Sequence, residues 1–346
     1  MIISRLLFVL VPLAVSWAVT AWVCSQAEQL RLVDAPNHRS SHVLPTPSGG
    51  GLGIVLAGLL SGGWLVLEQA SMDVRLCVVI ALSLLIAVVG LWDDVRPLPA
   101  TVRFGVQVVG CGGLLLELFG VPSASGSWFF SALLLLAGVW WVNLFNFMDG
   151  VDGLAGQQAV FMLVAAAVLV AGGHPEAMSH PVVSWMFCLA AATLGFLFLN
   201  WPPARIFMGD VGSTYLAFMI VFFSLATVLA GWLSYPVWLI LAAVFVTDAT
   251  VTLVRRMAQG ERWHEAHRTH AYQRLARRFG GHRPLIFLAA GINIFWLAPL
   301  AWGCLFFCPE WAWGLVVLAY APLALGVVFA GAGRREQEIR NAREAL

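Results

Sequence analysis

The sequence predicts an all-α, polytopic membrane protein of about 11 transmembrane helices, with the amino terminus outside and the carboxyl terminus in the cytoplasm. Composition, hydrophobic run length and the distribution of arginine support this prediction. Of the 346 residues, 60% are hydrophobic and 11% are charged, and the mean hydropathy is +0.86. A soluble domain carries roughly 25% charged residues, so most of this surface must face lipid instead of water.

Eleven apolar runs have the length of a membrane-spanning helix, which is about 20 residues. The first, from Leu6 to Val23, is longer than the apolar core of a signal peptide, so we interpret it as a retained helix. We place the spans near residues 5–27, 50–69, 74–91, 101–119, 128–147, 153–172, 182–199, 211–230, 235–254, 284–306 and 311–331. An odd number of spans puts the two termini on opposite sides of the bilayer.

The arginines indicate which side is the cytoplasm. The chain has 19 basic residues, all of them arginine, and this topology puts 17 on one side and 2, Arg5 and Arg75, on the other. Cytoplasmic loops carry the excess of positive charge, so the arginine-rich side is predicted to be cytoplasmic. The net charge of +1 argues against nucleic-acid binding, which needs a basic surplus. We predict one membrane domain over 1–346, with a basic cytoplasmic loop at 255–283 and a cytoplasmic tail at 332–346.

Seven of the eight aspartates fall on the same predicted inner side. The third span ends in GLWDDVRPLP, which contains Asp93 and Asp94. Adjacent carboxylates repel each other unless a cation lies near them, so this pair suits a divalent ion or a proton relay.

The fifth span ends in NLFNFMDGVDGLAG. Asn143, Asn146, Asp149 and Asp152 recur here every three residues, so they converge on one side of an α-helix or a 3₁₀ turn. A glycine follows each aspartate and interrupts the helix, as expected where the backbone approaches a ligand or turns sharply. The alternative interpretation is an Asn- and Asp-rich helix terminus.

The eighth span begins in RIFMGDVGSTY. Asp210 lies next to a glycine there, with Ser213 about one helical turn further on. A carboxylate beside close-approach glycine fits a hard metal ion bound together with substrate phosphates. A helix amino terminus would also favour an anion.

Two polar loops lie on the same predicted side. The loop RRMAQGERWHEAHRTHAYQRLARR carries His264, His267 and His270 among arginines that would repel a metal ion, so a phosphate-binding surface is favoured. A basic patch that contacts anionic lipid is the alternative. The loop VDAPNHRSSHVLPTPSGGGLG, between the first two spans, adds a further set of polar residues: Asp34, Asn37, Arg39 and His42.

Together these motifs resemble the polyprenyl-phosphate N-acetylhexosamine-1-phosphate transferase superfamily, glycosyltransferase family 4. DAPNHRSSH, the Asp pair, NxxNxxDGxDGLAG, FMGDVGS and a basic histidine loop occur in the family's order over nearly the whole chain. The resemblance implies transfer of a sugar 1-phosphate from a UDP-N-acetylhexosamine to undecaprenyl phosphate, with release of UMP. It also implies a Mg²⁺ cofactor, with Mn²⁺ as an alternative, and an active site on the cytoplasmic face of the bacterial inner membrane, within the lipid bilayer.

The resemblance also implies roles for individual residues. The expected catalytic residues are Asp93, Asp94, Asp149 and Asp152. The expected metal ligands are Asn146, Asp210 and Asp94. The expected substrate-binding residues are Asn37, Arg39, His42, Asn143, Asp248, Arg255, Arg256, His267, Arg268 and His270. Asp93 is the candidate base or phosphate-positioning group, and we favour direct in-line attack by the lipid phosphate over an aspartyl-phosphate intermediate on Asp93.

The chain departs from the peptidoglycan branch of the family in two places. HRTHAYQRL stands where that branch has a triple histidine, and the chain has no lysine for that branch's lysine contacts. These features make it more similar to the branch that initiates O-antigen, and hence lipopolysaccharide, assembly. Ser48 occupies the position where many relatives have arginine in PTPRGG, so a phosphate contact from that arginine is not expected here.

Some alternatives stay open at this level. An ion-coupled transporter would also place aspartates and glycines in helices, although its charges should lie near the bilayer midplane. The donor could carry N-acetylglucosamine or the fucosamine or quinovosamine type of sugar. The number of metal ions and the oligomeric state, with a homodimer as one option, are not determined by the sequence.

Overall fold

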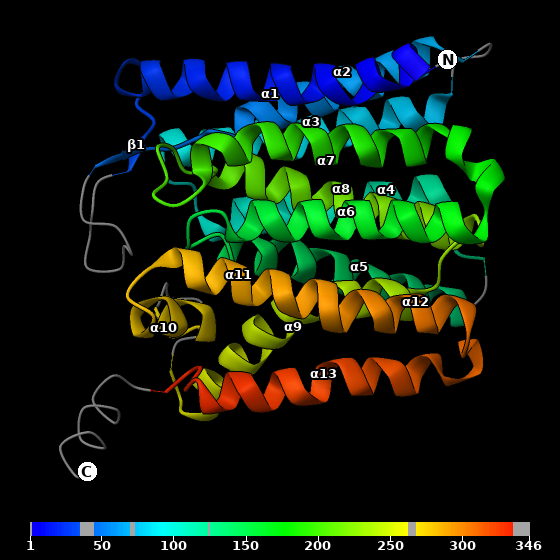
Figure 1. Cartoon of the computed structure of the whole chain (residues 1–346). Helices are drawn as coiled ribbons and strands as arrows, with labels where there is room; N and C mark the ends of the chain where they lie inside the picture. The colour runs from blue at the N-terminus through cyan, green and yellow to red at the C-terminus, as the bar shows by residue number, and fades with distance from the viewer. Residues whose placement is uncertain (1, 35–44, 70–72, 124, 262–267, 335–346) are drawn as a thin grey trace.

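The computed structural model describes residues 2–34, 45–69, 73–123, 125–261 and 268–334, with side chains described from residue 7 onward except at residue 125. The described chain is a bundle of long helices (Figure 1). Its helices are α1 (Ile2–Leu30), α2 (Gly51–Leu67), α3 (Val74–Val95), α4 (Ala100–Phe119), α5 (Ser125–Phe147), α6 (Leu154–Gly173), α7 (Pro181–Asn200), α8 (Gly209–Leu229), α9 (Tyr235–Ala258), α10 (Ala271–Arg278), α11 (His282–Ile292), α12 (Ala298–Phe306) and α13 (Ala312–Phe329). Shorter elements are the strands β1 (Val33–Asp34) and β2 (Thr46–Pro47), the 3₁₀ turns η1 (Pro175–Ser179) and η3 (Pro309–Trp311), and the π-helical turn η2 (Asn293–Leu297).

The helices confirm the all-α membrane fold predicted from the hydrophobic runs. Ten helices in the described part of the chain are long and apolar enough to cross a bilayer, and Gly51–Leu67 is a shorter apolar helix. The tenth predicted span corresponds to α11, η2 and α12, which run on as one 25-residue segment, His282–Phe306. Because lipid offers no hydrogen-bond partners, helices that satisfy their own backbone groups are the expected way to cross it.

Helix α8 lies at the centre of the bundle, and 83% of the residues in its apolar 18-residue stretch are buried. Helix α13 lies at the edge, and the corresponding share for Pro309–Phe329 is 6%. Tyr215, Phe218 and Phe223 on α8 are fully buried. Helix α2 approaches α8 closely, because a Cβ atom added at Gly51 would lie 2.6 Å from the backbone nitrogen of Gly212. Small residues allow this kind of close backbone packing in membranes, and here they bring α2 against the amino-terminal end of α8.

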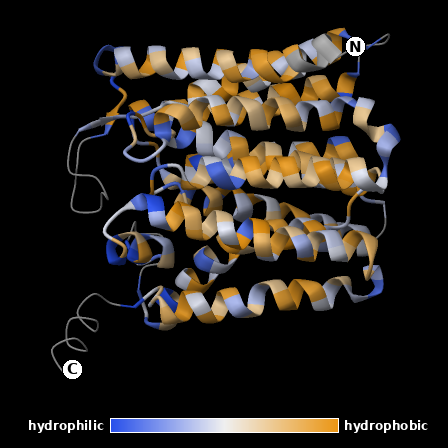
Figure 2. Cartoon of the chain, viewed as in Figure 1, coloured by the Kyte–Doolittle hydropathy of each residue, from blue (hydrophilic) through white to orange (hydrophobic). Residues whose placement is uncertain are grey.

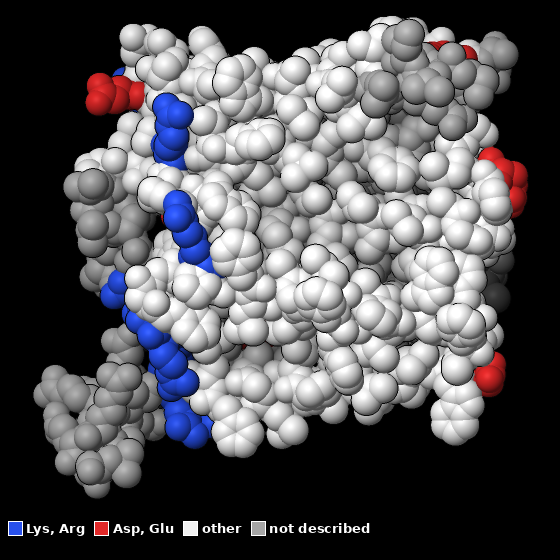
Figure 3. All heavy atoms as spheres, in the orientation of Figure 1, with Lys and Arg blue, Asp and Glu red and all other residues white. Residues whose placement is uncertain are grey.

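Polar and charged residues concentrate at the ends of the bundle, and apolar residues cover its length (Figure 2). Arginines form a row along one end, while most of the visible acidic side chains lie at the other (Figure 3). Helix α1 begins at one end of the bundle and α13 ends at the opposite one (Figure 1), as an odd number of crossings requires.

Two small elements at the arginine-rich end were not predicted from the sequence. Strands β1 and β2 pair antiparallel, with Val33 opposite Pro47. Helix α10 is eight residues long and packs against α9 and α11. Both elements are too short and too polar to give a hydrophobic-run signal, and both border the candidate active site.

Candidate active site

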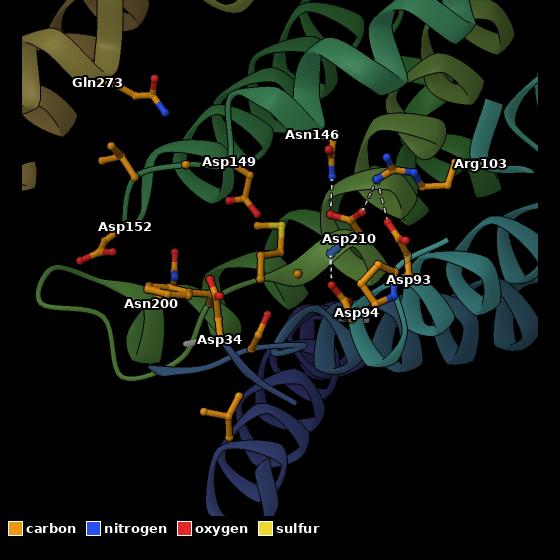
Figure 4. Close-up of a pocket in the computed structure, with 18 of the residues that line it drawn as sticks. Asp34, Asp93, Asp94, Arg103, Asn146, Asp149, Asp152, Asn200, Asp210 and Gln273 are labelled. Carbon is orange, nitrogen blue, oxygen red and sulfur yellow. Dashed lines mark hydrogen bonds and ion pairs between the residues drawn. The ribbon is translucent and has the colours of Figure 1, made fainter. Parts of the chain in front are cut away.

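A cavity of about 540 Å³ opens at the arginine-rich end of the bundle. We call it the aspartate cavity. Its lining comes from the loop after α1 and from α3, α4, α5, α7, α8, α10, α11 and the intervening turns (Figure 4). The polar side chains that line it are Asp34, Ser48, Asp93, Asp94, Arg103, Asn146, Asp149, Asp152, Asn200, Asp210, Gln273 and His282. All six residues expected to be catalytic or metal-binding therefore line one cavity, although they come from three separate parts of the chain.

Asp94 caps the amino terminus of α8. Its Oδ1 accepts a hydrogen bond from the backbone N–H of Asp210 at 2.8 Å, and its Oδ2 accepts one from that of Val211 at 3.0 Å. Gly209 makes this contact possible, because it has φ +76° and a Cβ there would lie 2.6 Å from Oδ2 of Asp94. The glycine of FMGD thus allows the third and eighth spans to meet through a carboxylate at a helix amino terminus.

Asp210 lies at the meeting point of α5 and α8. The side-chain amide of Asn146 donates to Oδ1 of Asp210 at 2.8 Å and to Oγ of Ser213 at 2.9 Å. Asn146 and Asp210, which the resemblance names as metal ligands, are therefore in direct contact in the structure (Figure 4).

Arg103, on the first turn of α4, holds two of the carboxylates together. Its Nη1 lies 2.7 Å from Oδ2 of Asp93 and 3.4 Å from Oδ2 of Asp210. Asp93 also accepts a hydrogen bond from the backbone N–H of Leu98. Sequence reasoning counted Arg103 only as a topology signal. Its position nine residues after Asp94, at the start of the next span, could have marked it as a partner for the pair.

The other end of the cavity is built around Asp152. Its Oδ2 accepts from the backbone N–H of Ala204 at 3.1 Å and pairs with Nδ1 of His282 at 3.1 Å. Asn200 completes this end by accepting from the backbone N–H of Gly153 and donating to the carbonyl of Ile206. His282 and Asn200 are single residues without a motif, so the sequence offered no signal for them.

Asp149 lies between these two ends, in the turn that follows α5. Within the described ranges, no side-chain hydrogen bond or ion pair to its carboxyl group is found. Burial raises the pKa of Asp149 well above the usual range of a carboxyl group, and three neighbouring aspartates raise it further. Of the cavity's carboxyl groups, Asp149 is therefore the one that a ligand could engage without breaking a bond within the protein.

Asp149→Asn is expected to stabilise the metal-free protein at neutral pH. A carboxyl group whose pKa is raised on folding destabilises the fold as pH rises from its ordinary pKa toward the folded one, because the unfolded chain ionises first. The unfolding midpoint in detergent with EDTA should rise by roughly 2 °C or more at pH 8, and the difference should shrink toward pH 4. A midpoint unchanged or lowered at pH 8 would contradict this assignment.

Without substrate, the side chains of the aspartate cavity supply only some of the ligands that a Mg²⁺ ion needs. Among the residues that the structure describes, no three His, Cys, Asp or Glu side chains are grouped as a ready metal site. Mg²⁺ is usually held by one or two carboxylates together with substrate phosphates and water. The carboxylate of Asp210 and the amide oxygen of Asn146 provide hard ligands of this kind, with Asp94 alongside, so the cavity fits a metal ion that is completed by substrate.

A second cavity of about 460 Å³, the apolar pocket, adjoins the first between α3, α4, α5 and α8. Arg103, Asn146 and Asp210 line both cavities. The remaining lining is mainly apolar and includes Phe104 and Leu136, which are 54% and 67% exposed on the outside of the bundle. The charged end of one cavity thus opens into an apolar pocket on the lipid-facing side of the bundle.

Comparison with known proteins identifies the family. The sequence profile of glycosyl transferase family 4 matches residues 76–228. A Bacillus subtilis (strain 168) protein named "Probable undecaprenyl-phosphate N-acetylglucosaminyl 1-phosphate transferase" is 31% identical over 271 residues, which cover 74% of this chain and 73% of the relative. The chain belongs to glycosyl transferase family 4.

Other relatives extend this match. The "Decaprenyl-phosphate N-acetylglucosaminephosphotransferase" of Mycolicibacterium smegmatis is 30% identical over 319 residues, covering 81% of this chain and 78% of the relative. The "Undecaprenyl-phosphate alpha-N-acetylglucosaminyl 1-phosphate transferase" of Yersinia pestis is 26% identical over 318 residues, with 85% and 83% covered. These names state no oligomeric state.

The part of the chain that matches the family profile contains the six residues expected to be catalytic or metal-binding, from Asp93 to Asp210. The basic loop of this glycosyl transferase family 4 member lies outside that part. The residues between 248 and 270 that were expected to bind substrate do not line the aspartate cavity: Asp248, Arg255, Arg256, Arg268 and His270. Asn143 lines the apolar pocket and donates to Oε1 of Gln107.

The contacts of these residues explain their placement. Asp248 is 4% exposed and accepts hydrogen bonds from the start of α10, and His270 is turned toward it. Arg255 donates to the carbonyl of Ala332, and Arg256 pairs with Glu261 at 3.0 Å. Asn37, Arg39, His42 and His267, also expected at the site, lie outside the described residues.

Proposed function

We propose that this protein transfers an N-acetylhexosamine 1-phosphate from a UDP-sugar to a polyprenyl phosphate, with release of UMP. The observation that carries the proposal is the shared wall of the two cavities, where Arg103, Asn146 and Asp210 face both a polar and an apolar space. A reaction between a nucleotide-sugar and a lipid phosphate needs such a junction. The names of the family relatives, which state polyprenyl phosphates and N-acetylglucosamine, agree with it.

The aspartate cavity suits the nucleotide-sugar. Asp149 and Asp152 supply acceptors for N–H and O–H groups beyond the Arg103 end of the cavity, where Asn200 accepts from the backbone N–H of Gly153 and His282 pairs with Asp152. The junction suits the phosphates, because Arg103 supplies a guanidinium that forms charge-assisted bonds with phosphate oxygens. The donor would therefore lie along the cavity with its pyrophosphate near Arg103.

Phosphoryl transfer requires mostly positioning and charge neutralisation from the protein. A bound Mg²⁺, or Mn²⁺ in its place, would neutralise charge on the phosphate oxygens, and Asp210 and Asn146, with Asp94, would hold it. Asp93 is placed by Arg103 and Leu98 at the side of the junction, where it can orient the acceptor phosphate. The acceptor is already ionised at neutral pH, so direct in-line attack needs no strong base.

The apolar pocket suits the lipid acceptor. Its exposed lining residues, such as Phe104 and Leu136, belong to the surface that faces lipid. A polyprenyl chain could therefore remain among apolar side chains while its phosphate reaches Arg103.

We propose undecaprenyl phosphate as the acceptor, an active site on the cytoplasmic face of the bacterial inner membrane, and a role in initiating O-antigen assembly. The arginine row at the cavity end (Figure 3) supports the cytoplasmic placement.

The test is UMP release by the purified protein in detergent, using a panel of UDP-N-acetylhexosamines. Release is expected only when a divalent cation and undecaprenyl phosphate are both present, and undecaprenol, which lacks the phosphate, serves as the matched control acceptor. A product with lipid-linked sugar identifies the donor. If no UDP-N-acetylhexosamine yields UMP under these conditions, the proposed function is wrong.

A further inference from the structure

Helix α10 is fastened to the membrane bundle by a buried carboxylate that lines neither cavity. Asp248 on α9 is 4% exposed. Its Oδ1 accepts from the backbone N–H of Ala271 at 2.9 Å, and its Oδ2 accepts from that of Tyr272 at 2.8 Å. Oδ1 also accepts from the hydroxyl of Thr252 at 3.1 Å. A carboxylate that receives the first N–H groups of a helix fixes both the position and the direction of that helix.

The next contact leads from α10 to the end of α5. The hydroxyl of Tyr272, a residue that is 4% exposed, donates to the backbone carbonyl of Phe147 at 2.9 Å. Phe147 directly follows Asn146, whose amide bonds Asp210, and Asp149 lies two residues further on. The neighbouring residue on α10, Gln273, lines the aspartate cavity. One short helix therefore touches the backbone between two groups of the proposed active site.

A glycine in the DGVDG motif makes room for this contact. If Gly150 carried a Cβ atom, that atom would collide with the hydroxyl oxygen of Tyr272, while its next contacts would be 3.3 and 3.4 Å away. Gly150 has no positive φ angle, so its backbone conformation alone does not call for glycine. The close approach of Tyr272 supplies the reason.

We infer that Asp248 and Tyr272 are positioning residues for the transfer reaction, which hold the carboxyl-terminal turn of α5 so that Asn146 and Asp149 face the cavity. This inference rests on the proposed function and adds two residues that act from outside the cavity. Burial raises the pKa of Tyr272, and the carboxylates of Asp248 and Asp149 raise it further, so its hydroxyl stays protonated and able to donate.

The chain offers a matched control for the tyrosine. Tyr320 on α13 also donates its hydroxyl to a backbone carbonyl, that of Leu239, at the same distance of 2.9 Å, and it lines neither cavity. Tyr272→Phe and Tyr320→Phe should therefore cost similar stability, measured as the unfolding midpoint in detergent. Only Tyr272→Phe should lower kcat, by about tenfold, since small misplacement of reacting groups is costly, with a smaller change in KM for the UDP-sugar.

Asp248→Asn should lower kcat further, by about a hundredfold, because an amide N–H would then face a backbone N–H of α10. The tyrosine variants cover the case in which this variant fails to fold.

Gly150→Ala provides an independent test through coupling. It should reproduce the kcat loss of Tyr272→Phe, yet cost little more in the Tyr272→Phe background, where the colliding oxygen is gone. Additive losses in this double-mutant cycle would contradict the role given to Gly150.

Hydrogen–deuterium exchange separates this inference from the proposed function. Backbone amides at 146–150 should exchange faster in Tyr272→Phe than in Tyr320→Phe or the unchanged protein, whether or not UMP is released. Unchanged exchange at 146–150, or equal kcat losses in the two tyrosine variants, would overturn the inference even if the transferase is fully active. If the exchange difference is present but no UDP-sugar is used, the positioning contact stands and the proposed reaction does not.

Discussion

Asp210→Asn is expected to abolish transfer, lowering the rate of UMP release by about a thousandfold or more. Asp210 lines both cavities, accepts from Asn146 and pairs with Arg103. The change keeps the size of the side chain but removes its negative charge. It therefore removes the carboxylate at the junction where the proposed metal ion and the two phosphates meet.

The control for this prediction is Asp73→Asn. Asp73 caps α3 at the opposite end of that helix from Asp94, by accepting from the backbone N–H of Arg75. Asparagine is also a good capping residue, so this variant should retain both activity and stability. The rates of UMP release by Asp210→Asn, Asp73→Asn and the unchanged protein are compared at saturating UDP-sugar and undecaprenyl phosphate. If Asp210→Asn keeps more than a tenth of the rate, Asp210 is not the central ligand proposed here.

Arg103→Met is expected to lower kcat/KM for the lipid acceptor by about a hundred- to a thousandfold. Arg103 bridges Asp93 and Asp210 and lines both cavities. Loss of its guanidinium leaves these carboxylates without their cation and the acceptor phosphate without a bidentate partner. Arg103→Lys should recover only part of the loss, because an ammonium group cannot form the two-pronged contact.

The kinetic pattern distinguishes an acceptor role for Arg103 from a general one. The KM for undecaprenyl phosphate should rise more than the dissociation constant of UMP measured by calorimetry. Arg75→Met, at the opposite end of the bundle and exposed, is the matched control and should change neither constant. If Arg103→Met weakened only the binding of UMP, Arg103 would contact the donor and not the acceptor phosphate.

The fold followed from the sequence because lipid restricts what a chain can do. Every predicted span corresponds to a helix or, for residues 284–306, to a continuous helical segment. The length of each apolar run reports the bilayer thickness directly. The gathering of Asp93, Asn146 and Asp210 was predictable in the same way, since alternate helix ends lie on the same side of the membrane.

The parts that could not be predicted depend on tertiary packing at the bundle end. Asp248 and His270 were expected to bind substrate, but they are directed at each other and at the start of α10. Their roles depend on where an eight-residue helix docks, and hydropathy carries no information on that. Arg103 was not recognised as a site residue, because the excess of arginines on the inner side already accounted for its position.

The apolar pocket and the aspartate cavity share three lining residues, and the rest of their linings comes from different parts of the bundle. As a result, the polyprenyl phosphate could reach the junction without leaving the membrane, and the UDP-sugar could reach it without entering the membrane. Neither would have to pass the other on its way in, and the two products could depart by the routes through which their parent molecules came.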